Sequence, residues 1–140
     1  MISPYAKFII TLTVWREMRS TPRAWRMVIW TILNRAAARD YNGAPLWWGG
    51  DPVAVCVHPW QFSSMTAKDD PQLRTWPREG DPEWAAIAAE VNNLTDGTVP
   101  PQTDAVYYYS LPLTAPPLAW GKVSLAQGGD LGPVKFFRQG

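Results

Sequence analysis

Apolar residues in the first third of the chain recur at three- and four-residue intervals and predict two helices. The first covers residues 5–19. Ser20 or Thr21 can cap a second helix that has Pro22 in its first turn. The short connection predicts a helical hairpin whose apolar faces meet near Glu17. One face of the second helix, which has the strongest amphipathic pattern in the chain, carries Trp25, Val28, Ile29, Ile32, Leu33 and Ala36.

The rest of the chain is predicted to contain a third helix and several short strands. Asp81 and Pro82 are a helix start signal, and helical spacing of apolar residues continues until Gly97. The pattern therefore predicts an α+β fold that is mainly helical, in which a small turn-rich, short-stranded region forms a cleft. Short extended segments are predicted at 53–57, 105–109, 120–125 and 134–137.

Length and charge narrow the class of protein. At 140 residues we expect a single domain, residues 1–140, without a separate wall-binding domain, and we expect a monomer. The 13 basic and 12 acidic residues are mixed, so no basic block favours nucleic acid as a partner. No apolar run approaches the ~20 residues needed to cross a bilayer, which argues against membrane insertion. The apolar run 8–15 has charged neighbours and lacks a cleavage site, so it indicates a core helix rather than a signal peptide.

Cysteine and histidine are too few for several common kinds of site. Cys56 is the only cysteine and His58 the only histidine. We therefore expect no disulfide, no metal site and no other cofactor. On a strand the two side chains would share a face, which leaves open a thiol-imidazole pair as in cysteine peptidases. The alternative is that Cys56 is a small core residue.

Glu17 is the carboxylate best placed for acid-base chemistry. It falls on the same side of the first helix as Thr13 and Val14, so it is expected to be partly desolvated. Burial favours the protonated form of a carboxyl group, which a general acid needs near neutral pH. The alternative is a structural salt bridge between Glu17 and Arg16 or Arg19.

Four short segments carry a resemblance to a known family. In order and spacing they resemble the SleB/CwlJ type of cell wall hydrolase. That family shows a Tyr-x-Glu-Ala-Arg-Gly-Glu segment, a helix ending in Leu-Asn-Arg, a Gln-Phe-Ser element, an aromatic pair and a C-terminal aromatic strand. The resemblance covers residues 12–137 of this chain. The segments are Val14-Trp15-Arg16-Glu17-Met18-Arg19, Thr31-Ile32-Leu33-Asn34-Arg35, Pro59-Trp60-Gln61-Phe62-Ser63 and Ala105-Val106-Tyr107-Tyr108-Tyr109.

The resemblance implies a lysozyme-like catalytic domain that acts on peptidoglycan, with Glu17 as the catalytic acid. Such an enzyme protonates the glycosidic oxygen between N-acetylmuramic acid and N-acetylglucosamine. In a lytic transglycosylase the same carboxylate then deprotonates the muramyl C6 hydroxyl, so one carboxylate suffices. A hydrolytic muramidase would need a second carboxylate ~5 to 10 Å away. Asp69, Asp70 and Asp104 are the candidates for that second group.

Further residues are expected to bind the glycan. The resemblance implies that Gln61 and Ser63 hydrogen-bond the acetamido groups or the scissile region, with Phe62 pointing into the core. Tyr107 and Tyr109 share one face of a strand, and the family's aromatic pair implies that this face lines the cleft, with Tyr108 on the other face. Trp60 and Trp120 are possible stacking platforms for sugar rings, or structural residues.

The chain also departs from the family pattern around the acid. Trp15 replaces the family's tyrosine, Arg16 its small residue, and Met18, Ser20 and Thr21 stand where Ala, Gly and Glu are found. A catalytically inactive glycan-binding or structural module of the same fold is therefore the main alternative. The absence of a signal suggests a phage-type endolysin that is made in the cytoplasm. It would reach the wall through a holin, in the phage particle or by nonclassical export.

Overall fold

The structure is a computed structural model that describes residues 2–47, 50–58, 61–110 and 113–140. Its three long helices are α1 (Pro4–Met18), α2 (Trp25–Ala37) and α5 (Pro82–Thr95). A single 3₁₀ turn, Pro22–Ala24, joins α1 to α2. The three helices predicted from apolar spacing are confirmed, as is the short connection between the first two. The cap expected from Ser20 or Thr21 is wrong, because Pro22 belongs to the 3₁₀ turn and α2 begins at Trp25 without a side-chain cap.

Local capping explains where α1 and α5 begin. The Ser3 side chain accepts a hydrogen bond from the backbone N–H of Ala6, and Pro4 occupies the first position of α1. Asp81 caps α5 in the same way by accepting from the backbone N–H of Trp84. A side-chain acceptor satisfies one of the free N–H groups at a helix start, so both signals could be recognised in the sequence.

The strand predicted at 53–57 is wrong. This segment is the short helix α3, Pro52–Val57. Asp51 accepts a hydrogen bond from the backbone N–H of Val53, and Pro52 begins the helix, which is the same Asp-Pro start signal found at α5. The cap and the proline therefore outweigh the strand preference of the valines.

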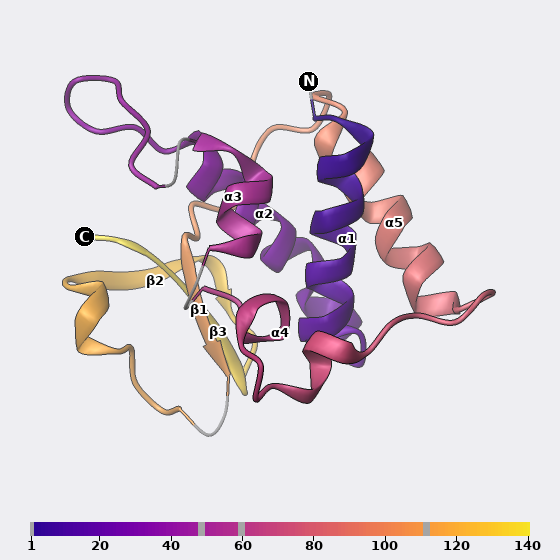
Figure 1. The fold of residues 1–140 in the computed structure, drawn as a ribbon. Helices are drawn as coiled ribbons and strands as arrows, with labels where there is room; N and C mark the ends of the chain where they lie inside the picture. The colour runs from indigo at the N-terminus through magenta and orange to yellow at the C-terminus, as the bar shows by residue number, and fades with distance from the viewer. Residues whose placement is uncertain (1, 48–49, 59–60, 111–112) are drawn as a thin grey trace.

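Two further short elements connect α3 to α5. They are the single-turn helix α4, Ser63–Thr66, and a 3₁₀ turn, Pro71–Arg74. Asp70 caps the 3₁₀ turn by accepting from the backbone N–H of Gln72. This connection lies at the C-terminal end of α1, as Figure 1 shows.

The C-terminal part forms a three-stranded antiparallel sheet in the order β1-β3-β2. The strands are β1 (Tyr107–Ser110), β2 (Val123–Asp130) and β3 (Val134–Gln139). They fall within or close to the predicted extended segments, so the α+β class is confirmed. In the register, Tyr107, Tyr108 and Tyr109 lie opposite Phe137, Phe136 and Lys135.

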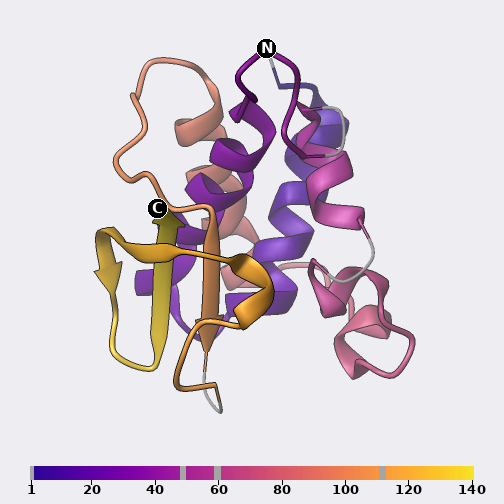
Figure 2. The same cartoon turned by 90° about the vertical axis from the view of Figure 1, so that its left-hand side faces the viewer.

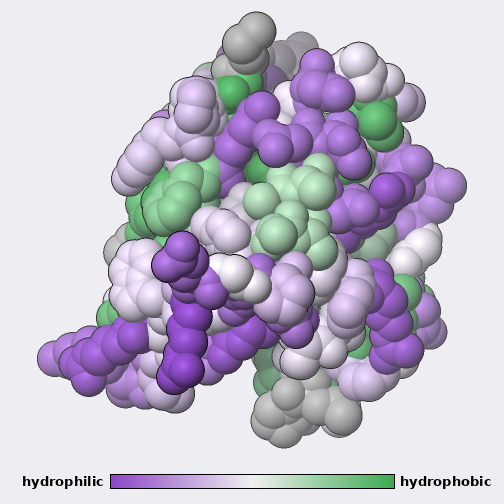
Figure 3. All heavy atoms as spheres, turned by 90° about the vertical axis from the view of Figure 1, so that its right-hand side faces the viewer, coloured by the Kyte–Doolittle hydropathy of each residue, from purple (hydrophilic) through white to green (hydrophobic). Residues whose placement is uncertain are grey.

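The core lies where the helices meet the sheet. In Figures 1 and 2, α1, α2 and α5 lie beside one another and the sheet flanks this helical part, with β1 next to α2. Phe136 is fully buried, as are Ile10, Ile29 and Ile87 of the three long helices. The face that carries α5 is mostly hydrophilic around a small apolar patch (Figure 3). The C-terminal end of α1, which carries Glu17, meets β1 through the hydrogen bond from Tyr108 to Glu17.

Candidate functional site

Glu17 occupies the last turn of α1 and is half-buried. The helix is packed on α2, α3 and α5, so its final turn is held firmly in place. The hydroxyl of Tyr108 on β1 donates a hydrogen bond to Glu17 Oε1 at 2.7 Å. A carboxyl group from the helical part is thereby fixed against the sheet.

Arg16 and Arg19 bind elsewhere and do not form the structural salt bridge that was the alternative for Glu17. Arg16 donates to the backbone carbonyls of Thr75 and Ser64 at 3.1 and 3.2 Å. Arg19 donates to Gln72 Oε1 at 2.6 Å, and its guanidinium lies over the Trp15 ring. Ion pairs within the described ranges join Arg26 to Glu90, Lys135 to Asp130 and Arg138 to Asp104.

Glu17 lines a cleft of about 720 Å³ between the helices and the sheet. This volume is in the range of small-molecule binding sites, and aromatic rings make up much of the wall. The cleft brings together segments from α1, α2, the start of α4, β1 and the turn before β2. Its described lining residues are Glu17, Thr31, Arg35, Trp47, Gln61, Phe62, Ser63, Tyr107, Tyr108, Tyr109, Ser110, Leu113, Pro117, Ala119 and Trp120.

Tyr107 and Tyr109 line the cleft as expected, but Tyr108 lines it as well. Tyr108, expected on the opposite face, is the residue that contacts Glu17, and its ring packs against Phe62 and Phe136. Tyr107 and Tyr109 lie on the other face of β1, although both also contribute to the cleft wall. The register of β1 against β3 determines which face each ring takes, and the alternation of side chains alone does not reveal it.

Tyr108 is held in its protonated form. Burial of the hydroxyl, followed by the neighbouring charge of Glu17 and their hydrogen bond, raises the pKa of Tyr108 well above its usual range. The hydroxyl therefore remains a donor near neutral pH and orients the carboxyl group of Glu17. Tyr108 is the main site residue that the sequence did not single out.

Trp120 forms a stacked aromatic wall with the strand tyrosines. Its ring stacks on Tyr107 with centroids 4.7 Å apart and an interplanar angle of 12°, and it also lies 6.5 Å from the Tyr109 ring. Trp47 meets Tyr107 edge to face at 6.1 Å. Trp120 thus lies in the cleft, as expected of a stacking residue, while part of its surface packs on protein. Trp60, the other expected platform, lies outside the described residues.

Arg35 brings a positive charge to the cleft wall from the last turn of α2. The guanidinium carbon lies 5.2 Å from the ring centroids of both Trp47 and Tyr107. Burial lowers the pKa of Arg35 to about 10, while Tyr107 and Tyr108 act in the opposite direction. Arg35 is therefore still charged near neutral pH, and the cleft holds a cation as well as an acid.

Asn34 links α2 to the strand that carries Tyr108. Its side-chain amide donates to the backbone carbonyls of Thr103 and Ala105, each at 2.9 Å. These two bonds fix the segment directly before β1. Asn34 and Arg35 are the last two residues of the Leu-Asn-Arg segment, so that segment supplies a structural clamp and a charged wall residue.

Gln61, Phe62 and Ser63 all reach the cleft wall. Phe62 is buried in the core, as expected. Ser63 is exposed, and its hydroxyl donates to Asp70 Oδ2 at 2.5 Å. Asp70 is thus one hydrogen bond away from the cleft without being part of its lining.

The other candidates for a second carboxylate are not in the cleft lining. Asp104 accepts from the backbone N–H of Gln127 and pairs with Arg138 at 3.4 Å. Asp69 is exposed. Among the described residues that line the cleft, Glu17 is the carboxylic acid.

The thiol-imidazole pair of Cys56 and His58 required both side chains to lie on one face of a strand, and the structure does not provide that strand. The segment is helical, so the two side chains do not alternate on a strand face. Cys56 is fully buried, and burial raises the pKa of its thiol to about 12. A thiol with that pKa stays protonated near neutral pH and is a poor nucleophile.

Neither a metal site nor a membrane span is found in the described part of the chain. Across residues 2–47, 50–58, 61–110 and 113–140, no three Asp, Glu, His or Cys side chains are grouped so as to bind a metal. The helices of these ranges are all too short or too polar to cross a bilayer.

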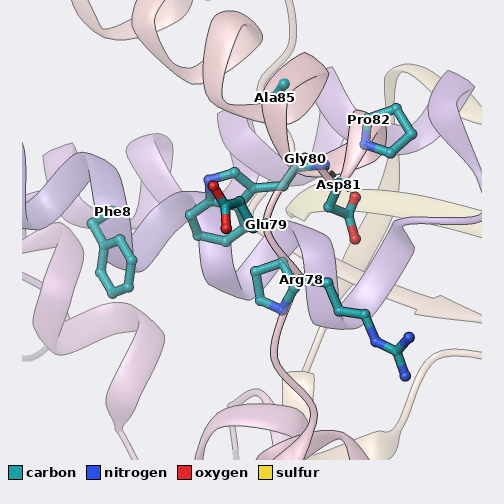
Figure 4. A pocket seen from close by; sticks show the side chains of 9 residues that line it. Phe8, Arg78, Glu79, Gly80, Asp81, Pro82 and Ala85 are labelled. Atoms are coloured by element: carbon teal, nitrogen blue, oxygen red, sulfur yellow. Dashed lines mark hydrogen bonds between the residues drawn. The ribbon is translucent and has the colours of Figure 1, made fainter.

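A second hollow of about 460 Å³ lies between α1 and the segment that leads into α5. Figure 4 shows Phe8 of α1 on one side and residues 78–82 on the other. Phe8 meets the Trp84 ring edge to face at 5.6 Å. Asp81 caps α5, and Arg78 and Glu79 are exposed. This hollow lacks an oriented acid like the Glu17–Tyr108 pair, so the cleft is the stronger candidate site.

Comparisons of the chain with protein-family models, curated proteins and solved structures gave no match.

Proposed function

We propose that this protein cleaves the glycan strand of peptidoglycan between N-acetylmuramic acid and N-acetylglucosamine, as a lytic transglycosylase with a lysozyme-like arrangement. One observation carries the proposal: Glu17 lies in the wall of an aromatic-lined cleft with one carboxyl oxygen held by Tyr108 at 2.7 Å. The resemblance of the sequence to cell wall hydrolases supports the same assignment.

The reaction needs Glu17 first as an acid and then as a base. The protonated carboxyl transfers its proton to the glycosidic oxygen as the bond from that oxygen to the muramyl C1 breaks, and positive charge develops at C1. The resulting carboxylate then takes the proton of the C6 hydroxyl on the same sugar. The C6 oxygen bonds to C1 and closes a 1,6-anhydro ring, and Glu17 is again protonated. No water is consumed.

The surrounding residues would support this sequence of steps. Tyr108 holds one oxygen of Glu17, which leaves the other oxygen to carry the proton. The aromatic wall that includes Trp120 and Tyr107 offers flat apolar surface to sugar rings. Gln61 and Ser63 supply polar groups for the acetamido substituents. The charge of Arg35 suits the carboxylate of the muramyl lactyl group.

The content of the cleft favours the transglycosylase route over simple hydrolysis. A muramidase of the usual kind needs a second carboxylate ~5 to 10 Å from the acid. Glu17 is the carboxylic acid among the described lining residues, and Asp70 reaches the cleft only through Ser63. A route that uses one carboxylate twice requires no such partner.

Clearing of purified peptidoglycan sacculi tests the proposal. Wild-type protein is expected to lower the turbidity of a sacculus suspension, and Glu17→Gln, which keeps the shape of the side chain but cannot donate a carboxyl proton, is expected to lose at least about 100-fold in rate. Equal clearing by the two proteins would overturn the role of Glu17. If neither protein clears sacculi but both sediment with them, the inactive glycan-binding alternative holds.

A further inference from the structure

The hydroxyl of Ser63 is fixed by a carboxylate just outside the cleft. Ser63 Oγ donates to Asp70 Oδ2 at 2.5 Å, while the other oxygen of Asp70 accepts from the backbone N–H of Gln72 at 2.8 Å. Both carboxylate oxygens are therefore engaged, and the side chain has a single orientation. Ser63 itself lies in the cleft wall together with Glu17.

The segment that carries this pair is tied to the end of α1. Arg16, the residue before Glu17, donates to the carbonyls of Ser64 and Thr75. Arg19 donates to Gln72, which lies beside Asp70 in the 3₁₀ turn. The position of the Ser63 hydroxyl is thus coupled through two arginines to the helical turn that presents the acid.

The direction of the Ser63–Asp70 bond sets what Ser63 can offer a ligand. A serine hydroxyl has one proton and two lone pairs, and a free hydroxyl rotates to donate or to accept. An ionised carboxylate only accepts, so the single proton of Ser63 is committed to Asp70. The lone pairs that remain can only accept a hydrogen bond from a group in the cleft.

We infer that Asp70 is a positioning residue that makes Ser63 an obligatory hydrogen-bond acceptor for the amide N–H of a sugar's N-acetyl group. The inference rests on the proposed function, which brings an N-acetylated glycan into the cleft. Asp70 contributes to recognition of the substrate through Ser63 and does not act as the second carboxylate of a hydrolase.

Affinity for a β-1,4-linked tetramer of N-acetylglucosamine, measured by calorimetry, tests the inference. All variants carry Glu17→Gln so that the ligand is not cleaved. Ser63→Ala removes the acceptor and is expected to weaken binding about 3- to 10-fold. Asp70→Asn can still cap the 3₁₀ turn, but its amide donates to Ser63 and turns the serine proton toward the ligand. The Ser63 O–H and the amide N–H of the N-acetyl group are both donors and would then face each other. The loss of affinity is therefore expected to be at least as large as in Ser63→Ala.

Two further measurements separate positioning from general damage to the fold. In the Ser63→Ala background, Asp70→Asn is expected to cause no additional loss, because its effect passes through Ser63. Asp96→Asn is the matched control. Asp96 also accepts one backbone N–H and one hydroxyl, both from Thr98, but it lies outside the cleft lining. This control is expected to bind like the parent.

Each outcome is decisive. Unchanged affinity in Asp70→Asn, or an equal loss with and without the Ser63 hydroxyl, would overturn the positioning role while leaving the proposed function intact. If the Glu17→Gln parent shows no binding of the tetramer, this inference fails, and sacculus clearing by the wild type tests the proposed function separately. Thermal unfolding of each variant confirms that the comparison is between folded proteins.

Discussion

The contact between Glu17 and Tyr108 joins residues that are 91 positions apart in the chain. A glutamate on the last turn of a helix would ordinarily be free to take several rotamers in solvent. The tyrosine hydroxyl restricts that freedom, and burial keeps the hydroxyl protonated. The chemistry proposed for the cleft therefore depends on a donor supplied by the sheet.

Removing only that hydroxyl gives the first prediction. Tyr108→Phe keeps the ring between Phe62 and Phe136 but loses the hydrogen bond to Glu17. We expect the rate of sacculus clearing to fall about 10- to 100-fold, because hydrogen bonds to charged groups contribute about 1.5 to 3 kcal/mol.

Tyr5→Phe is the control for this change, because Tyr5 is exposed at the start of α1 and is not in the cleft lining. Its activity is expected to match the wild type. An undiminished rate in Tyr108→Phe would show that the acid does not need the tyrosine for its orientation.

The buried thiol gives a prediction about stability against pH. The folded protein raises the pKa of Cys56 from 9.0 to about 12, so folding favours the protonated thiol. The stability from this group is fully present below pH 9 and is lost as pH rises toward 12. Between about pH 8 and about pH 10.5, the free energy of unfolding is expected to fall about 1 to 2 kcal/mol more in wild type than in Cys56→Ala.

Urea unfolding followed by tryptophan fluorescence at both pH values measures this difference. The variant has its own stability cost from the missing sulfur, but that cost is the same at each pH and cancels in the comparison. Parallel pH dependence in the two proteins would show that the thiol titrates normally in the folded state.

At the scale of elements, the C-terminal end of α2 contributes two residues to the site. Asn34 clamps the segment before β1 and Arg35 enters the cleft wall one residue later. The strand that presents Tyr108 is short and lies at one edge of the sheet, where β3 is its partner among the described strands. The clamp from α2 therefore supplies support that a second neighbouring strand would otherwise provide.

Asn34→Ala tests this support. It removes two hydrogen bonds and leaves the carbonyls of Thr103 and Ala105 without that donor, so the free energy of unfolding is expected to fall by about 1 to 3 kcal/mol. Clearing activity is expected to fall as well, because Tyr108 is held less firmly against Glu17.

Asn92→Ala provides the matched comparison, since Asn92 is an exposed asparagine on α5. Chemical denaturation and the sacculus assay are expected to show little change in this variant. A stable, fully active Asn34→Ala protein would contradict the role of the clamp.

The elements that were predicted correctly are those specified by local signals. Apolar spacing places α1, α2 and α5 within a few residues of each start, and a side-chain cap also marks the starts of α1 and α5. The helix α3 is the exception, because the valines at 53–57 favour a strand while Asp51 and Pro52 in front of them start a helix. Asp51 and Pro52 form the same start signal as Asp81 and Pro82, so the sequence does contain the information that specifies α3.

At the scale of the whole molecule, the site is formed by segments that the sequence does not place relative to one another. Glu17 could be singled out because it ends an apolar helix. Its contact with Tyr108 depends on the register of β1 against β3 and on how the sheet packs against the helices. The link from Asp70 to Ser63 likewise depends on how the chain turns between α4 and the following 3₁₀ turn.

The fold also gives a structural role to two residues near Glu17 that depart from the pattern of the resembling family. Arg16, which stands where the resembling family has a small residue, is buried and holds Ser64 and Thr75. Met18 is part of the core. Arg16 and Met18 thus have structural roles and are absent from the cleft lining, while Glu17 remains part of it.

The mass of the soluble products released from purified peptidoglycan tests the central claim most directly. The proposed mechanism predicts fragments that end in 1,6-anhydro-N-acetylmuramic acid, one water lighter than hydrolytic products, from wild type but not from Glu17→Gln. Fragments that carry reducing ends would contradict the transglycosylase route. Products that still appear with Glu17→Gln would contradict the assignment of Glu17 as the acid.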